Sequence, residues 1–488
     1  MTSARGRTLV WLRNDLRLRD NPALFHAAEP RCGVVAVYVL CEQFIKQHIT
    51  GAARLDFIRR HLELLNRDLG KRHIPLVLLR VAKPDSIPSK LLKLAQKEGC
   101  EQLFFNAEYP VDELARDRAV AEACRREGIR FKRFHDRVIL PPGKVRNGQG
   151  EPYQVFTAFK RRWLELASSQ LAQPHGLPAR QPEETGEVKD RGHRPDTLFT
   201  DLALRDLSSL WPAGEDVALK RLKTFTDGAI HDYNAILDYK KTRDFPAQSG
   251  TSLLSPYLAV GSLSPRQCLN AALAANGENW QGDEGVETWI SELVWRDFYQ
   301  HVTVDFPQVC RHKPLQPHTD RFPWRSSDED LDCWQQGDTG IPIIDAAMRQ
   351  LKDTGWMHNR LRMVVAMFLT KNLRIDWRKG EAWFMSQLID GDFAANNGGW
   401  QWSASTGTDA APYFRIFNPV TQSERFDPKG EFIRRYVPEL AGLSEKEIHQ
   451  PPPTKGYPEP MVDLKASRKK TIELFKSLNS EAPSGERS

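Results

Sequence analysis

VVAVYVL, residues 34–40, is an almost wholly apolar run in which four of the seven residues are valine. Valine is branched at Cβ and favours strands. A continuous apolar run is typical of a strand that is buried on both faces in a parallel sheet. With its flanking residues the run covers 32–41, about half of what a membrane-spanning helix needs. We therefore predict a buried strand here, and no membrane span.

Similar strand-like runs recur through the first 140 residues: TLVWLR (8–13), IPLVLLRV (74–81), EQLFFNAEY (101–109) and RFKRFHD (130–136). Residues 52–70, 84–98 and 111–126 lie between them and have helical apolar spacing. This alternation predicts an α/β domain with a doubly wound parallel sheet. No GxGxxG or GxxxxGK[ST] motif is present, so neither a dinucleotide fingerprint nor a P-loop is supported.

The rest of the chain predicts a second, all-α domain. Residues 172–200 are rich in Pro, Gly and charge, which is typical of a surface linker. Helical patterns follow almost to residue 440. We predict an α/β domain over 1–140, a linker over 141–201, a helical domain over 202–445, and a polar tail over 446–488 with one helix near 463–478.

Composition indicates a soluble, globular protein of two or more domains. The net charge of +6 is compatible with nucleic-acid binding but does not require it. No secretory signal is visible, and the seven cysteines include no CxxC pair. These features predict a cytoplasmic protein with reduced thiols and no zinc site. Ten of the 13 tryptophans lie between residues 280 and 402, which packing alone could also explain.

The stretch NNGGWQW, residues 396–402, places two of these indoles two residues apart. On a helix or a strand, this spacing points Trp400 and Trp402 to opposite sides. The adjacent glycines allow a close approach of backbone or ligand. The segment therefore predicts two different tasks for the two rings.

WISELVWRDFYQ, residues 289–300, predicts a helix with two distinct faces. Ile290, Val294 and Phe298 form an apolar stripe. The other face is aromatic yet charged and consists of Trp289, Glu292, Trp295, Arg296 and Tyr299. Two explanations stand open for this second face: a ligand site, or an interface with an ordinary i,i+4 ion pair between Glu292 and Arg296.

HNRLRMVVAMFLTKNL, residues 358–373, predicts another two-faced helix. Opposite its apolar stripe lie Asn359, Arg362, Met363 and Ala366, where a solvent-exposed face would carry Lys and Glu. This composition favours a second buried contact. That contact is either a bound ligand or more protein.

Two carboxylates follow in LIDGDF, where Asp390 and Asp392 flank Gly391 among apolar neighbours. Such carboxylates need partners. No third ligand lies at metal spacing, so we predict pairing with Arg362 and hydrogen bonds to a polar ligand, with no metal. GTSLLSP, residues 250–256, is a Gly-initiated turn that can hold a phosphate or simply cap a helix.

Several of these motifs together resemble the photolyase/cryptochrome family, and most closely its class I photolyases that repair cyclobutane pyrimidine dimers. The similarity runs from residue 11 to residue 435. It rests on WLRNDLRLRDNPAL, ELVWRDFYQH, TGWMHNRLRM, DWRKGE, SQLIDGDFAANNGGWQWSASTGTDAAPYFRIFNP and FRIFNPVTQSERFDPKGEFIRR.

The resemblance implies FAD in the helical domain, active as the reduced anion. It implies that Asn396 lies beside flavin N5, where an amide does not readily give up a proton and so favours the fully reduced flavin. The residues implied to hold FAD are Tyr239, Thr251, Ser252, Leu253, Leu254, Ser255, Trp289, Glu292, Arg296, Asn359, Arg362, Asp390, Gly391, Asp392 and Asn396.

The resemblance also gives the two indoles their tasks. It implies that Trp400 begins an electron path through Trp377 to Trp324 at the surface, and that Trp402 faces a lesion flipped out of the duplex. Glu292 would stabilise the dimer radical anion. The residues implied to contact lesion or DNA backbone are Arg243, Glu292, Trp295, Asn359, Arg360, Met363, Trp402, Arg415 and Gln422. His358 followed by Asn359 departs from the histidine pair of (6-4) photolyases and argues against that activity.

A second chromophore, an antenna, is implied as well. His48, Glu113 and Cys310 match positions that contact methenyltetrahydrofolate in relatives that use it. Asp112 and Arg311 stand where Asn and Lys are expected, so a deazaflavin antenna remains the alternative.

The implied function is light-driven splitting of cyclobutane pyrimidine dimers in damaged DNA by a monomeric, cytoplasmic, nucleoid-associated enzyme. The alternative is a cryptochrome-type photoreceptor, which would share the fold and the flavin site. A flavin oxidoreductase would need an NAD(P)H site, and the sequence offers no motif for one.

Overall fold

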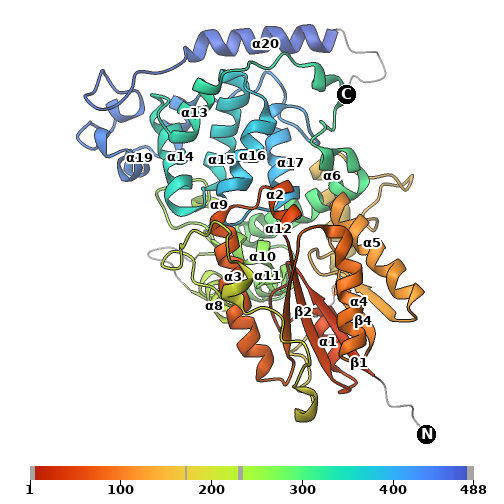
Figure 1. Ribbon diagram of the computed structural model, residues 1–488. Coiled ribbons are helices and arrows are strands. Elements are labelled where there is room, and N and C mark those ends of the chain that lie inside the picture. Colours follow the sequence, from red (N-terminus) through yellow and green to blue (C-terminus); the bar gives the residue numbers. More distant parts are fainter. Residues whose placement is uncertain (1–5, 171–172, 229–234, 481–488) are drawn as a thin grey trace.

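The computed structural model describes residues 6–170, 173–228 and 235–480. Two parts are visible, a sheet flanked by helices and a larger helical part (Figure 1). All five predicted strands form, and they pair in parallel in the order β3-β2-β1-β4-β5. Their bounds are β1 Arg7–Leu12, β2 Val34–Cys41, β3 Leu76–Val81, β4 Cys100–Asn106 and β5 Arg130–Phe134.

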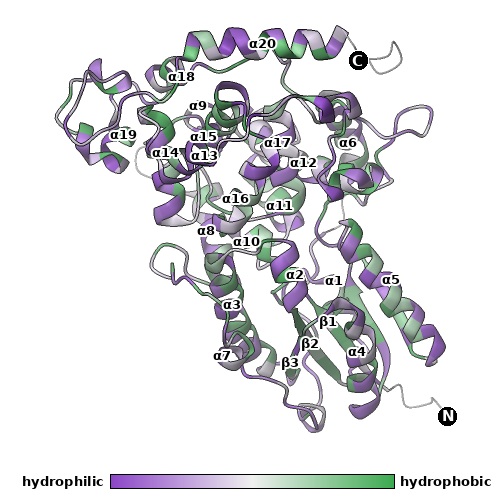
Figure 2. Ribbon diagram, turned by 45° about the horizontal axis from the view of Figure 1, so that its top comes forward, coloured by the Kyte–Doolittle hydropathy of each residue, from purple (hydrophilic) through white to green (hydrophobic). Residues whose placement is uncertain are grey.

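Helices cover both faces of the sheet, which confirms the doubly wound prediction. Along β1, Val10 and Leu12 join the core beneath α1 and α3, whereas Leu9 and Trp11 join the core beneath α4 and α5. The inner strands β1 and β2 are mostly hydrophobic and buried (Figure 2), as expected for strands that are covered on both faces. The edge strand β5 has the sequence RFKRF and is largely exposed. The helix bounds are α1 Pro22–Ala28, α3 Ala52–Gly70, α4 Ile87–Lys97 and α5 Val111–Arg126.

The second part is helical, as predicted. Its main helices are α8 Glu215–Asp227, α10 Ser255–Val260, α11 Pro265–Ala275, α12 Glu284–Asp305, α13 Asp328–Gln336, α14 Pro342–Thr354, α15 Asn359–Met367, α16 Trp377–Gln387, α17 Phe393–Ala404, α18 Pro419–Phe426, α19 Glu431–Tyr436 and α20 Leu464–Ser480. The predicted helix over 358–373 begins after the capping residue His358 and changes to a π-helical turn at Phe368–Leu373. Within the described part of the chain, no helix is both long enough and apolar enough to cross a bilayer.

The predicted linker holds a helix that was not predicted, and the helix predicted in the tail forms. Residues 141–201 include α6 (Phe156–Gln170), in which Phe159 and Trp163 are buried against α12. The predicted tail helix forms as α20 and packs on the π-helical turn, with Phe475 buried beside Phe322. The predicted linker over 141–201 is therefore not a linker throughout.

A buried cluster of four charges joins the two parts. Asp136 accepts hydrogen bonds from Arg17 at 2.5 Å and from Arg266 at 2.7 Å. Arg266 also lies 2.9 Å from Asp20. All four side chains are at most 8% exposed. Buried charges are tolerated only when they are paired with good geometry, so this cluster holds the two parts in one orientation.

His61 makes a second contact between the parts, and it is sensitive to pH. Its Nδ1 donates to the carbonyl of Phe57, and its Nε2 accepts from the amide of Gly214. Burial lowers the pKa of His61 from 6.5 to about 4. Because the folded-state pKa lies below the unfolded one, the stability contributed by neutral His61 is present above pH 6.5 and is lost as the pH falls towards 4.

We expect this group alone to lower the free energy of unfolding by about 2 kcal/mol between pH 7 and pH 5. Urea unfolding at the two pH values measures the loss. The variant His61→Gln keeps an acceptor for Gly214 and removes the titration, so it should lose less stability than the wild type. Equal losses in both proteins would rule out His61 as the cause.

Candidate functional site

Most of the predicted flavin residues lie on neighbouring helices. Helix α12 packs against α17 and against α9 (Tyr239–Thr242), and α15 also packs against α17. The residues that these elements and the turn before α17 contribute are Tyr239, Trp289, Glu292, Arg296, Asn359, Arg362, Asp390, Gly391, Asp392 and Asn396. Trp289 is only 4% exposed, whereas Glu292, Arg296 and Asn396 are half-buried. An aromatic residue is therefore buried in this group, and the polar side chains lie nearer to solvent.

Asp390 pairs with Arg362 as the sequence predicts. Arg362 Nη2 donates to Asp390 Oδ2 at 2.8 Å, and Arg362 Nε donates to the carbonyl of Met357. The second oxygen of Asp390 is buried and has no partner. A buried carboxylate oxygen without a donor is costly. It therefore indicates a bound group that carries a hydroxyl or amino donor.

The predicted pairing of Asp392 with Arg362 is wrong. Asp392 caps α17 by accepting from the amide of Ala395, and it accepts from Arg137 Nη2 at 2.5 Å and from Gln300 Nε2 at 3.2 Å. Burial would raise the pKa of Asp392, but Arg137 and Arg296 outweigh it and hold that pKa below its ordinary value. Arg137 is 255 residues away in the chain, so no local motif could reveal it.

The ordinary ion pair considered for α12 does not form. Glu292 Oε1 accepts from Arg243 at 2.6 Å, while Arg296 donates to the carbonyl of Arg137. Glu292 and Arg243 are both predicted substrate-binding residues, and the structure joins them. Arg360, a third such residue, lies 2.8 Å from Asp244.

Trp295 is supported from behind by a residue that sequence reasoning missed. Its ring stacks on Phe156 with centroids 3.5 Å apart and planes 5° apart. Phe156 is buried at the start of α6, inside the predicted linker. Phe156 therefore covers one face of Trp295, and Tyr299 also lies against the ring, with centroids 5.6 Å apart and planes 29° apart. Trp295 remains half-buried.

The two indoles of NNGGWQW have different surroundings. Trp400 is 2% exposed and packs edge-on against Phe384 and Trp334. Trp402 is half-buried. A Cβ at position 380 would lie 2.2 Å from the Trp400 ring, so Gly380 is needed for the close approach of α16 to α17. These surroundings agree with the prediction that the rings point to opposite sides.

Exposure rises along the predicted electron path. Trp400 and Trp377 are buried, at 2% and 1% exposure, whereas Trp324 is half-buried. The Trp324 ring packs on Phe322, which in turn packs on Phe475 of α20. Of the three rings, Trp324 is the one that reaches solvent.

The turn over residues 250–255 has a strained backbone. Leu253 has a φ of +52°, in the left-handed region that a non-glycine residue rarely adopts. Strained backbone conformations of this kind are often found at ligand-binding sites. Thr251 and Ser252 are half-buried, Leu254 is buried, and Ser255 accepts a hydrogen bond from the indole of Trp356.

The remaining predicted DNA residues lie close to solvent. Asn359 and Arg415 are exposed, and Met363 is half-buried. Gln422 is half-buried in α18, and its side-chain oxygen has no partner. Cationic and amide groups of this kind can contact a phosphate backbone.

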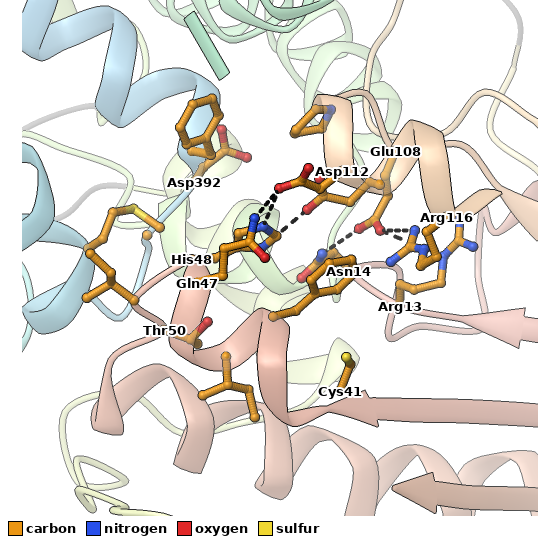
Figure 3. Close-up of a pocket in the computed structure, with 18 of the residues that line it drawn as sticks. Arg13, Asn14, Cys41, Gln47, His48, Thr50, Glu108, Asp112, Arg116 and Asp392 are labelled. Atoms are coloured by element: carbon orange, nitrogen blue, oxygen red, sulfur yellow. Dashed lines mark hydrogen bonds and ion pairs between the residues drawn. The ribbon is translucent and has the colours of Figure 1, made fainter. Parts of the chain in front are cut away.

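A cavity of about 420 Å³ lies between the two parts, and two of the predicted flavin residues, Gly391 and Asp392, also line it (Figure 3). The predicted antenna residues all line it: His48, Asp112, Glu113, Cys310 and Arg311. His48 lies 3.6 Å from both Asp112 and Glu113, and Arg311 reaches across from the helical part to Asp112 at 2.8 Å.

The inner wall of this cavity comes from residues that the sequence analysis did not single out. Asn14 follows β1 and donates to Glu108, which follows β4 and pairs with Arg116 at 2.8 Å (Figure 3). The carboxyl ends of parallel strands are the usual ligand-binding edge of such a sheet. Because Asn14 and Glu108 directly follow predicted strands, this rule could have identified them from the sequence.

Among the described residues that line the cavity, five polar atoms are buried without a partner: Trp11 Nε1, Arg13 Nε, Glu113 Oε2, Arg137 Nη1 and Gln300 Oε1. Burial raises the pKa of Glu113. The cavity therefore offers acceptors and a cation to a polar ligand. Among the residues that the structure places, no cluster of His, Cys, Asp and Glu could hold a metal ion.

A parallel sheet, a helical part with the predicted flavin residues, and a cavity between the two parts together are typical of the photolyase/cryptochrome class. Residues 8–182 match the family model described as DNA photolyase. Residues 289–477 match the model described as the FAD binding domain of DNA photolyase. The chain belongs to the DNA photolyase family.

Two curated relatives are named deoxyribodipyrimidine photo-lyase. The one from Vibrio cholerae is 43% identical over 96% of this chain and 99% of its own length. The one from Escherichia coli is 42% identical over 96% of this chain and 98% of its own length. These relatives confirm the predicted family and the predicted photo-lyase type of enzyme.

Solved structures agree with the fold. A class III photolyase from Agrobacterium tumefaciens superposes with a TM-score of 0.87 at 34% identity, covering 98% of this chain and 99% of that one. A cryptochrome from Synechocystis superposes with a TM-score of 0.84 at 29% identity, covering 97% and 100%. They confirm the predicted fold class, and the FAD-binding family model confirms the prediction of FAD.

Proposed function

We propose that this chain repairs DNA by using light and bound, reduced FAD to split cyclobutane pyrimidine dimers. The observation that carries the proposal is the pairing of Glu292 with Arg243 beside the stacked ring of Trp295. A carboxylate, a phosphate-binding cation and a half-buried indole suit a flipped-out, negatively charged dinucleotide.

The residues of the helical part fit FAD. Asp390 has an unsatisfied buried oxygen for a hydroxyl or amino donor, and Arg362 beside it supplies a cation for a phosphate. The turn over 250–255 supplies hydroxyls from Thr251 and Ser252. Asn396 Nδ2 donates to the carbonyl of Glu381 at 3.0 Å, which leaves the side-chain oxygen of Asn396 as the atom that would accept from a ligand. When bound and excited by light, reduced FAD supplies one electron to the dimer.

The chain's own residues would position the substrate and stabilise the negative charge that it gains. Trp295 and Trp402 would flank the extruded dimer, and stacking on indole recovers part of the cost of extrusion. Glu292, held by Arg243, would hydrogen-bond the pyrimidines and stabilise the charge that they gain. Asn359 and Met363 would contact the lesion from α15. Arg360, Arg415 and Gln422 would hold the flanking backbone without reading its sequence.

Trp400, Trp377 and Trp324 form the electron path in this proposal. Indole is readily oxidised, and the rise in exposure from Trp400 to Trp324 gives electrons a route from the surface to the flavin. This path restores the reduced cofactor and takes no part in the splitting of the dimer.

The interdomain cavity is proposed to hold the antenna, with methenyltetrahydrofolate as the favoured chromophore. The unpaired Glu113 Oε2 suits the amino and ring N–H donors of a pterin, and Arg137 suits a carboxylate. A deazaflavin is the alternative, and an archaeal relative whose structure holds two FAD molecules offers another flavin-type precedent. Damaged DNA is the proposed partner, for a monomer in the cytoplasm that associates with the nucleoid.

Photorepair tests the proposal. The purified protein is reduced anaerobically, mixed with an oligonucleotide that contains a thymine dimer, and illuminated in the blue. We expect the absorbance of thymine to return in the light and not in a dark control. No recovery, with FAD shown to be bound and reduced, would reject the lyase and favour the cryptochrome-type photoreceptor.

A further inference from the structure

A cavity of about 550 Å³ lies at the C-terminal end of the fold, away from both sites described above. It is enclosed by the start of α14, the loop before α18, residues 449–451, and the segment 460–468 that leads into α20. α20 runs along the outer edge of the helical part (Figure 1). None of the residues that line this cavity is a predicted flavin, lesion or antenna residue.

The inner wall is apolar with one unsatisfied acceptor. Ile341, Ile416, Phe417 and Val462 supply apolar surface. Asn372 is 2% exposed and donates through Nδ2 to Ser467 at 2.9 Å, but its Oδ1 is buried without a partner. A buried acceptor of this kind costs stability unless a ligand donates to it.

The rim is cationic. Lys465 and Arg468 line the cavity, are exposed, and have no carboxylate within ion-pair distance among the residues that the structure describes. Asp463 also lines the cavity and caps α20 through Oδ1, which accepts from the amides of Lys465 and Ala466. The two cations are therefore free to bind an external anion.

We propose that this cavity binds a nucleoside monophosphate. The apolar walls would hold the base, and an N–H donor on the base would satisfy Asn372. The phosphate would lie at the rim between Lys465 and Arg468. The volume suits a ligand of this size. The site is separate from photorepair, so its failure would leave the proposed function untouched.

Calorimetric titration of AMP into the FAD-loaded protein tests the proposal. We expect saturable binding that weakens about tenfold when Lys465→Gln and Arg468→Gln are combined, since loss of the charge-assisted contacts removes about 1.4 kcal/mol or more. The matched control combines Lys469→Gln and Lys470→Gln, which removes the same charge from exposed positions of α20 that do not line the cavity. The control should bind AMP within about twofold of the wild type.

Two ligand variants test the orientation. Adenosine lacks the phosphate and should bind equally to the wild type and to the Lys465/Arg468 variant. Purine riboside monophosphate lacks the amino group and should bind about tenfold more weakly than AMP, because Asn372 keeps its unpaired oxygen. Absence of saturable AMP binding, or an equal loss in both charge variants, would overturn the proposal. Photorepair by both variants at the wild-type rate would show that they are folded.

Discussion

Replacing Trp400 by phenylalanine is expected to slow photoreduction of the oxidised flavin by at least about tenfold, since a rise of only about 1.4 kcal/mol in the barrier has that effect. Trp400 is 2% exposed and is the innermost ring of the proposed path. A phenyl ring fills most of the same space but is far harder to oxidise than indole. Repair by protein that has been reduced chemically should remain, because the path serves only to reload the flavin.

A matched control is available in the same cluster. Trp334 is fully buried and lies edge-on to Trp400 at 6.0 Å between ring centroids, but it is not part of the proposed path. The variant Trp334→Phe creates a similar packing defect and should photoreduce at nearly the wild-type rate. The flavin absorbance under blue light with an external thiol measures both variants. Equal slowing in the two would mean that packing, not electron transfer, is responsible.

Replacing Asp392 by alanine is expected to lower the free energy of unfolding by about 3–5 kcal/mol and to weaken retention of FAD. The substitution leaves Arg137 buried without its carboxylate and removes the cap of α17. Removing one partner of a buried ion pair is costly because the remaining charge stays desolvated. Chemical unfolding and the flavin content after gel filtration measure the two effects.

Two further variants separate the causes. Asp392→Asn can still cap the helix, so it should recover about 1 kcal/mol of the loss while the ion pair stays broken. Asp328→Asn breaks an exposed pair with Lys379 and should cost less than about 1 kcal/mol. If Asp392→Ala were as mild as Asp328→Asn, the pair with Arg137 would not be structurally important.

The sequence predicted those features that depend on neighbours along the chain. Runs rich in Val, Leu, Phe and Tyr located the five strands. The inner strands have continuous apolar runs because both of their faces are buried, as the split of β1 between two cores shows. Helical spacing located α12 and α15, and the proximity of Arg362 to Asp390 was anticipated. The resemblance supplied the identity of the cofactor, which no periodicity encodes.

The features that were missed depend on distant contacts. Glu292 pairs with Arg243 and not with Arg296 one turn away, because Arg296 is drawn to the carbonyl of Arg137. Phe156 lies within the predicted linker over 141–201, yet its ring supports Trp295. In each case the tertiary contact outweighs a local pattern.

The cluster formed by Arg17, Asp136, Arg266 and Asp20 has a consequence for how light would be used. Transfer of excitation between two pigments depends on the angle between their transition dipoles as well as on their separation. A cavity between two loosely hinged domains would sample many angles. Here, separating the two parts would leave buried charges without their partners and without water, which is costly. The ion pairs therefore hold the two parts, and with them both pigments, in one relative orientation. The yield of energy transfer would then be a property of the fold.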